Sequence, residues 1–390
     1  MVSLRINEEE NEPQIELVYL LFAGAEAVEE ENVEMAYSIL ERLISMSAID
    51  GSPMQRLGSY FAETFAARLT SNNSSHLFQG LTPFRNFNSH AYEETEMLEA
   101  FAAMHELIPI GRFVHFTMNQ VLLDAVEEQK FIHLIDFQVW YGSQWPAFLQ
   151  SLALRPSGPP MRVRMTAIGS SLKELEENGR KLLEYAREMG ISFKYHPLVT
   201  ELHDFKASMI EMRRDEVCLI NSLGVFHRLL HGGSEIFHEL LCNLKSDVRP
   251  KLLVMSETDG NHNGSSFKHR FVECLRFYAA IFDVFDATLP QTSLTRIQLE
   301  HLFAGQKIRN IISCEGAARV ERHENMQSWS MRMHAAQFNR YFISSRAVNQ
   351  ANHLLEIYKA TSDGYTSTYS DGALILGWRN MPLVHVSAWS

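Results

Sequence analysis

The sequence predicts an α/β protein with a helical N-terminal part, a mostly parallel central sheet and antiparallel strands at its C-terminal edge. Three observations predict this class. Apolar residues recur at helical spacing through the first third of the chain. After Phe131, short continuous apolar runs alternate with helical patterns, which is typical of parallel strands covered on both faces. After Tyr365, three strand-like runs are joined by turns so short that only antiparallel hairpins fit.

The N-terminal part is expected to be entirely helical. Apolar spacing predicts helices over Leu17–Val28, Ala36–Ser47, Met54–Leu69, Met97–Met104 and Phe113–Val126. We therefore predict a helical cap over residues 1–127 and a core over residues 128–390. Because the helical pattern begins by Leu17, we expect a bare domain without a disordered leader.

The core is expected to hold five parallel strands and three antiparallel ones. The parallel strands are predicted at Phe131–Phe137, Met161–Gly169, Ile191–Tyr195, Val217–Asn221 and Lys251–Glu257. The antiparallel strands are predicted at Tyr365–Tyr369, Ala373–Trp378 and Pro382–Trp389, with the Trp389 ring buried where the last strand closes the sheet edge. Between the second and third strands, Ser171 and Glu174 form a capping box and Gly190 ends the helix.

Composition and charge exclude several classes of protein. The 390 residues are 46% hydrophobic and 21% charged, which argues against a disordered or fibrous chain. The net charge is 35 − 47 = −12, so bulk charge does not attract the chain to nucleic acid or anionic membrane. The four cysteines are widely spaced without a C-x-x-C pair, which argues against a disulfide framework or a zinc ribbon and fits an intracellular protein. No segment predicts a transmembrane helix or a signal peptide.

The end of the first parallel strand is where a Rossmann-like fold would bind a ligand. Asp136 occupies that place, but the turn after it holds a single glycine, Gly142, between Trp140 and Trp145. A dinucleotide cradle needs a glycine-rich turn, and the second strand ends in Ile168–Ser171 without a carboxylate to hold a ribose. We therefore expect no cofactor, and we expect the two tryptophans to pack around this turn. A small-molecule pocket lined by them is the alternative.

Other catalytic or metal-binding patterns are weak. The sequence has no G-x-S-x-G elbow, Walker A loop or H-E-x-x-H pair. His227 and His231 have the i, i+4 spacing of a zinc pair, but their apolar neighbours favour the edge of a core. Glu257, Asp259 and His262 follow the fifth strand and form either a metal or acid–base cluster or, as we favour, an ordinary turn.

A local basic strip is the candidate for contact with nucleic-acid phosphates. The dense charge run from Arg319 to Glu324 has the spacing of a salt-bridged helical face. Arginines before, within and after this run form the strip: Arg309, Arg319, Arg322, Arg332, Arg340 and Arg346. Because Glu315, Glu321 and Glu324 would neutralise some of them, we expect two or three to remain available in each chain.

Several segments resemble, in order along the chain, the motifs of the plant GRAS family. Ile132–Phe137 with Gly142 and Gln144–Pro146 resembles the VHIID motif. The helices over Leu17–Leu69 resemble the first leucine-rich region, Leu172–Leu198 the second, Ser266–Asp286 the PFYRE block, and Asn310–Gly316, Arg322–Glu324, Trp329 and Ser387–Trp389 the SAW region. The PFYRE letters themselves are not intact, and no acidic DELLA-type leader is present, so binding to a gibberellin receptor is not implied.

This resemblance implies a methyltransferase-like Rossmann core with a helical cap, acting as a nuclear transcriptional regulator. It also implies homo- or heterodimers, other GRAS proteins or transcription factors as partners, and promoter DNA as a possible ligand of the dimer. Candidate partner contacts in the cap are Leu17, Leu21, Met35 and Leu43, and the expected structural positions are His133, Asp136, Gly142, Trp145 and Trp389. The alternative is a methyltransferase-like enzyme or small-molecule binder with a pocket near Asp136; subfamily, pathway and target promoters stay open.

Overall fold

The computed structural model describes residues 8–72, 94–139, 142–359 and 362–390, which form two compact units. The first unit joins Met1–Leu107 to Asn261–Arg322, and the second joins Ile108–Gly260 to His323–Ser390. The predicted boundary at residue 127 separates a cap from a core along the sequence, whereas these two units are groups of residues that lie close together in space. The boundary therefore stays a prediction. Within the described residues, no helix is long and apolar enough to cross a membrane.

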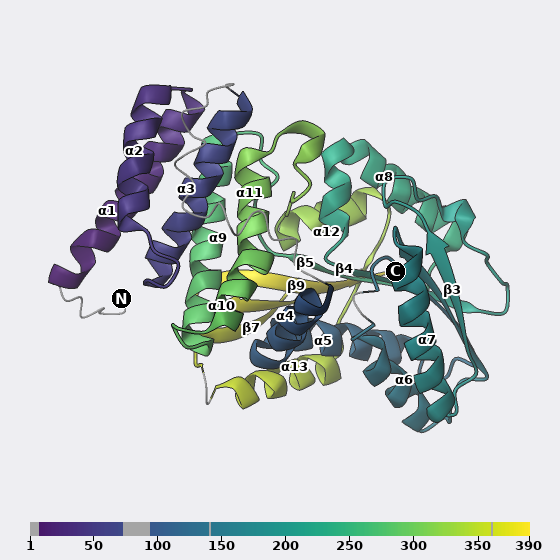
Figure 1. Ribbon diagram of the computed structural model, residues 1–390. Helices are drawn as coiled ribbons and strands as arrows, with labels where there is room; N and C mark the ends of the chain where they lie inside the picture. Colours follow the sequence, from purple (N-terminus) through teal and green to yellow (C-terminus); the bar gives the residue numbers. More distant parts are fainter. Residues whose placement is uncertain (1–7, 73–93, 140–141, 360–361) are drawn as a thin grey trace. The chain divides into compact units, whose positions relative to one another are not determined.

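The first unit is helical and is built from two distant stretches of the chain. Its helices are α1 (Glu8–Glu29), α2 (Val33–Met46), α3 (Pro53–Asn72), α4 (Glu94–Leu107), α9 (Phe267–Thr288), α10 (Leu294–Leu299) and α11 (Gln306–Ser313), with a π-helical turn at Glu300–Gly305 and a 3₁₀ turn at Gly316–Ala318. Helix α3 packs against α1 and α2 and also against α9 and α11 (Figure 1). Phe61, Phe65 and Phe271 meet at ring-centroid distances of 5.5 to 6.1 Å and form the centre of this core.

A buried ion-pair network joins the two stretches of the first unit. Glu300 accepts hydrogen bonds from Arg56 Nε at 2.8 Å and from Arg296 Nη1 at 3.0 Å. All three side chains are at most 2% exposed. Arg56 also reaches the half-exposed Asp286 at 3.0 Å. A carboxylate between two guanidinium groups is the arrangement that makes buried charge tolerable.

The second unit holds the sheet that the sequence predicts. Its strands lie in the order β3-β2-β1-β4-β5-β9-β8-β7, and β6 also pairs with β9. Strands β1 (Phe131–Asp136), β2 (Arg162–Gly169), β3 (Phe193–Val199), β4 (Val217–Leu223) and β5 (Leu252–Thr258) are parallel. Strands β7 (Tyr365–Ser370), β8 (Ala373–Trp378) and β9 (Met381–Trp389) are antiparallel, and so is the short β6 (Arg340–Tyr341). Both the mostly parallel sheet and its antiparallel C-terminal strands are confirmed.

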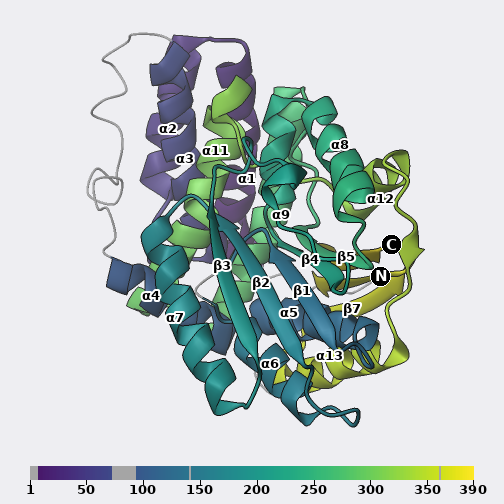
Figure 2. The same ribbon diagram turned by 90° about the vertical axis from the view of Figure 1, so that its right-hand side faces the viewer.

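Helices cover both faces of this sheet. They are α5 (Pro109–Ala125), α6 (Trp145–Leu154), α7 (Leu172–Glu188), α8 (Ser234–Asn243), α12 (Met326–Ala335) and α13 (Ser345–Tyr358), with shorter turns at Ala207–Met209, Phe226–Gly232 and Leu244–Val248. Figure 2 shows β3, β2 and β1 side by side with α7 beside them. Helix α5 packs against β5, β9 and α6. The Ser171 cap of α7 accepts the Glu174 N–H, and Gly190 takes a φ of +69°, as the sequence predicts.

Two local predictions are wrong. Strand β3 lies at Phe193–Val199, later than the predicted Ile191–Tyr195. The charge run from Arg319 to Glu324 is not helical. The Asn310 side chain accepts the N–H groups of Val320 and Glu321, so tertiary hydrogen bonds fix this segment and override its helical charge spacing.

Candidate functional site

The carboxyl end of β1, where a Rossmann-like fold would hold a ligand, is occupied by side chains of the second unit. Asp136 is fully buried and accepts three hydrogen bonds. The donors are Trp145 Nε1 at 2.8 Å, Asn221 Nδ2 at 3.0 Å and the Gln138 N–H at 3.2 Å. Burial raises the pKa of Asp136 to about 6, although each of these donors favours its charged form.

Three amides extend this network. Gln144 Nε2 donates to Asn119 Oδ1 and to Asn221 Oδ1, both at 3.0 Å. Asn119 Nδ2 returns a bond of 2.9 Å to the Gln144 carbonyl. All three side chains are at most 5% exposed. The network therefore links β1, β4 and α5 to the turn before α6.

The turn itself leaves no glycine cradle among its described residues. Gly142 takes a φ of +69°, which a residue with a side chain adopts only with strain. This glycine therefore allows the backbone to turn before α6. Trp145 follows at the start of α6, 1% exposed, with its ring 5.5 Å from that of Phe148. Trp140 lies outside the described residues.

An S-adenosyl-type cofactor, which the methyltransferase-like fold implies, does not fit these residues. The Asp136 carboxylate is engaged by protein donors, one of which is the buried Trp145 indole. The end of β2 supplies Gly169 and Ser170, with the Leu175 side chain 3.3 Å from where a Gly169 Cβ would lie, and no carboxylate. We therefore derive no catalytic step through such a cofactor.

His133 is a neutral structural residue. Its Nε2 lies 2.8 Å from Thr166 Oγ1, and its Nδ1 accepts from Arg164 Nη2 at 3.1 Å. Burial, followed by the nearby Arg164 charge, lowers the pKa of His133 to about 3. This imidazole is therefore uncharged near neutrality, and it links β1 to side chains of β2.

A second polar cluster lies at the carboxyl end of β5. Glu257 accepts from His227 Nδ1 at 2.7 Å and from the Phe226 N–H at 2.7 Å. Burial alone would raise the pKa of Glu257, but His227 and the further histidines His323 and His385 bring it below its ordinary value. The His227 and His323 rings lie 4.3 Å apart between centroids, tilted by 35°. His227 is thus a buried core residue, as the sequence favoured.

The remaining members of the predicted metal patterns serve other roles. His231 Nδ1 lies 2.5 Å from the Arg228 carbonyl, inside its own turn. Asp259 accepts the Met326 N–H at 3.1 Å. His262 belongs to the first unit, where its carbonyl accepts from Arg319 at 2.9 Å.

The six arginines of the predicted strip are divided between the two units. In the first unit Arg309 is exposed on α11, whereas Arg319 is 4% exposed and Arg322 is half-buried. In the second unit Arg332 makes a two-pronged pair with Glu324 at 2.6 and 2.7 Å. The other two members are described below.

Of the other two arginines, Arg340 is engaged within the protein and Arg346 is exposed. Arg340 donates to Asp371 at 2.7 Å and lies over the Trp389 ring at 4.3 Å. Arg346 has a side chain 68% exposed, with Asp124 at 3.7 Å. Within the strip, Arg309 and Arg346 are the exposed arginines, and the number available for phosphate contact stays a prediction.

Three of the four cap candidates form the core of the first unit. Leu17, Leu21 and Leu43 are at most 1% exposed, whereas Met35 is 44% exposed. The outer face of α1 instead carries Ile15 and Tyr19, which are 53% and 72% exposed. The i, i+4 spacing of these two residues could have indicated a second apolar face of α1. The more regular leucine pattern of the same helix obscured it.

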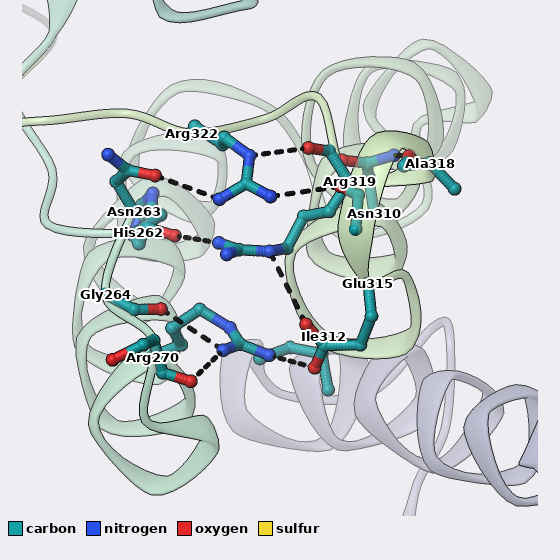
Figure 3. A network of polar contacts seen from close by, with 12 residues as sticks. His262, Asn263, Gly264, Arg270, Asn310, Ile312, Glu315, Ala318, Arg319 and Arg322 are labelled. Atoms are coloured by element: carbon teal, nitrogen blue, oxygen red, sulfur yellow. Dashed lines mark hydrogen bonds and ion pairs between the residues drawn. The ribbon is translucent and has the colours of Figure 1, made fainter. Parts of the chain in front are cut away.

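Three arginines of the first unit contact Glu315, and a fourth, Arg322, contacts Arg319. We call Arg68, Arg270, Arg319, Arg322 and Glu315 the Glu315 arginine cluster; Figure 3 shows all of its members except Arg68 labelled. Arg68 Nη1 donates to Glu315 Oε1 at 2.9 Å, Arg270 Nη2 donates to the same oxygen, and Arg319 Nε lies 3.8 Å from Oε2. Arg322 Nε donates to the Arg319 carbonyl at 2.9 Å. The sequence reasoning missed Arg68 and Arg270, because they are separated from Glu315 by other helices along the chain.

Comparison with known proteins agrees with this architecture. The GRAS domain family model matches residues 17–390. DELLA protein GAI1 of Vitis vinifera is 35% identical over 97% of this chain and 62% of its own length, and DELLA protein RGL1 of Arabidopsis thaliana is 35% identical over 97% and 70%. Scarecrow-like protein 28 of Arabidopsis thaliana is 32% identical over 98% of this chain and 59% of its own length. The chain thus spans about three fifths to seven tenths of these relatives.

A solved structure shares the fold over nearly the whole chain. The crystal structure of SCL7 in Oryza sativa superposes with a TM-score of 0.82 at 26% identity, covering 96% of this chain and 99% of that one. The chain therefore belongs to the GRAS domain family of plant transcriptional regulators.

Proposed function

We propose that this chain is a non-enzymatic transcriptional regulator that acts in the nucleus through protein contacts, as a homodimer or with another GRAS protein or transcription factor. Family membership supports the regulatory role. One observation carries the non-enzymatic part: the ligand edge of the sheet is filled by Trp145 and by amides that hold Asp136. A carboxylate with three protein donors is already satisfied and has little left to offer a substrate.

Partner contact is proposed at exposed apolar positions of the first unit. Met35 remains from the cap residues named from the sequence, and Ile15 and Tyr19 add an exposed apolar stripe on α1. Leu17, Leu21 and Leu43 support such contact indirectly, since their burial fixes α1 and α2. An amphipathic partner helix is the kind of element that binds such a surface.

Direct binding of promoter DNA by a dimer is a second candidate. The exposed side chains of Arg309 and Arg346 favour it. Two contacts per chain on a molecule of net charge −12 would give weak, salt-sensitive binding. A dimer would double the contacts and thus bind more tightly.

The test tethers the chain to a promoter by a heterologous DNA-binding domain and measures reporter output in plant protoplasts. We expect a change of output that depends on the apolar stripe and is lost in Tyr19→Glu. Calorimetry of the purified chain with S-adenosylmethionine is the second arm, for which we expect no binding. Methyl transfer that disappears in Asp136→Asn would overturn the non-enzymatic proposal in favour of the enzyme alternative.

A further inference from the structure

The Glu315 arginine cluster concentrates positive charge within the first unit. Arg270 and Arg319 lie against Glu315, and Arg322 lies against Arg319 (Figure 3). Arg68 donates to the same carboxylate. Within the described residues, Glu315 is the carboxylate recorded in ion pairs with these arginines. Three guanidinium groups thus share one carboxylate, and a fourth lies beside them.

Burial makes this imbalance costly. The side chains of Arg270 and Arg319 are 1% and 4% exposed, so water screens their mutual repulsion poorly. Burial, together with the charges of Arg270 and Arg322, lowers the pKa of Arg319 to about 10. A second anion beside Glu315 would relieve this repulsion.

Some hydrogen-bond donors of the cluster have no protein partner. Backbone carbonyls hold the guanidinium groups in place: His262 for Arg319, Gly264 and Ser265 for Arg270, and Ile312 for Arg68. The Nε atoms of Arg68 and Arg270 are buried without a hydrogen-bond partner in the described structure. The donors are therefore fixed in position and only partly used.

The cluster is also open to solvent on one side. Glu315 is 49% exposed and the Arg68 side chain is 13% exposed. Gly316, Ala317 and Ala318, which follow Glu315, are exposed as well. An anion can thus approach beside Glu315 without unfolding the unit.

We propose that the Glu315 arginine cluster is a binding site for the dianionic group of a phosphate monoester, with Arg68 at its rim and Arg319 at its base. Planar guanidinium forks match the oxygens of a phosphate, and charge-assisted bonds to it are strong. A monoester offers three free oxygens and two negative charges to these guanidinium groups, whereas the diester of a nucleic-acid backbone offers two free oxygens and one charge. This site does not depend on the proposed regulatory function.

The test titrates the folded chain calorimetrically with inorganic phosphate, O-phosphoserine and dimethyl phosphate at constant ionic strength. We expect inorganic phosphate and O-phosphoserine, whose phosphate groups can carry two negative charges, to bind. Dimethyl phosphate should bind at least about tenfold more weakly, because a diester carries one charge and two free oxygens. Tighter binding of O-phosphoserine would indicate a phosphorylated protein as the source, and tighter binding of inorganic phosphate a small phosphate. Equal affinity for the diester would overturn the proposal in favour of a nucleic-acid site.

Variants separate a binding site from a purely structural network. Arg68→Gln should weaken phosphate binding about tenfold, whereas Arg309→Gln, an equal charge change at an exposed arginine of α11, should leave it unchanged. Glu315→Gln should strengthen binding about fivefold because it removes the resident anion. Should Arg68→Gln fail to fold, Arg68→Lys keeps the charge, loses the planar fork and should also weaken binding. Weaker binding in Glu315→Gln, or equal effects of the Arg68 and Arg309 changes, would overturn the proposal.

Discussion

The indole Nε1 of Trp145 donates a hydrogen bond of 2.8 Å to Oδ2 of Asp136, so the ligand edge of the sheet is closed by an aromatic ring from the next helix. Asn221 binds the other carboxylate oxygen from the neighbouring strand. In other Rossmann-like proteins the residue at this position contacts a ligand, whereas here it joins β1, β4 and α6.

Asp136→Asn should change how stability depends on pH. Because the folded pKa of about 6 lies above the ordinary 3.8, the folded state holds a proton that the unfolded state releases between these values, and stability falls as pH rises through that window. The wild type should therefore lose about 2 kcal/mol relative to Asp136→Asn between pH 4 and pH 7. Urea unfolding of both proteins at the two pH values measures this, and a constant difference would contradict it.

Glu300→Gln should strongly destabilise the first unit. The substitution leaves Arg56 and Arg296 buried without their carboxylate, which typically costs about 3–5 kcal/mol. Asp286→Asn is the matched control, since this half-exposed partner of Arg56 should contribute less than about 1 kcal/mol. Thermal unfolding followed by circular dichroism distinguishes them, and equal losses in the two variants would show that Glu300 is not the anchor.

Trp389→Ala should destabilise the second unit. The ring is fully buried on β9, which pairs with β5, β8 and β6, and removal of a buried tryptophan costs about 3–5 kcal/mol. Deletion from Pro382 onward should give insoluble or partly unfolded protein. Leu154→Ala, at a side chain 76% exposed, should change stability by less than about 0.5 kcal/mol. A truncated chain that stays monodisperse with an unchanged Tm would refute the expectation.

Tyr19→Glu should reduce association without reducing stability. Tyr19 is 72% exposed on α1, so a charge there disturbs a partner surface but not the core. Leu17→Ala, two residues earlier and buried in the core, should instead cost about 2–5 kcal/mol of stability. Light scattering over a concentration series and thermal melts report the two properties. Unchanged association in Tyr19→Glu would remove the α1 stripe as a contact surface.

DNA affinity should depend on Arg309 and Arg346 and should be insensitive to Arg332. Each lost phosphate contact reduces the slope of log affinity against log salt by about 0.9. Arg309→Gln and Arg346→Gln should therefore flatten the slope, whereas Arg332→Gln, whose arginine is engaged by Glu324, should not. Mobility shifts at two salt concentrations test this. If neither Arg309→Gln nor Arg346→Gln changes the affinity or the salt slope, these two arginines are not the DNA contacts.

The sequence predicted the sheet well because its signals are local. Continuous apolar runs, short turns and the Ser171 cap each specify structure within a few residues. The predicted helix at Arg319–Glu324 failed because its hydrogen bonds come from Asn310 and His262, which no local pattern reveals.

The candidate sites were predictable in part for the same reason. Asp136 could be placed at the ligand edge from its strand alone, whereas its donor Asn221 lies 85 residues away. Leu17 and Leu21 could be recognised as apolar, but the pattern alone could not separate a core face from a partner face.

The helical unit has a consequence for biosynthesis. Arg56 and its partner Glu300 are 244 residues apart, and α3 packs on α9 and α11, which leave the ribosome much later. At about 5–20 residues per second, the early helices wait roughly 10–50 s for the segments that complete their core. During that interval Leu21, Phe61 and Phe65 lack their final neighbours, so the nascent chain is a natural client for chaperones.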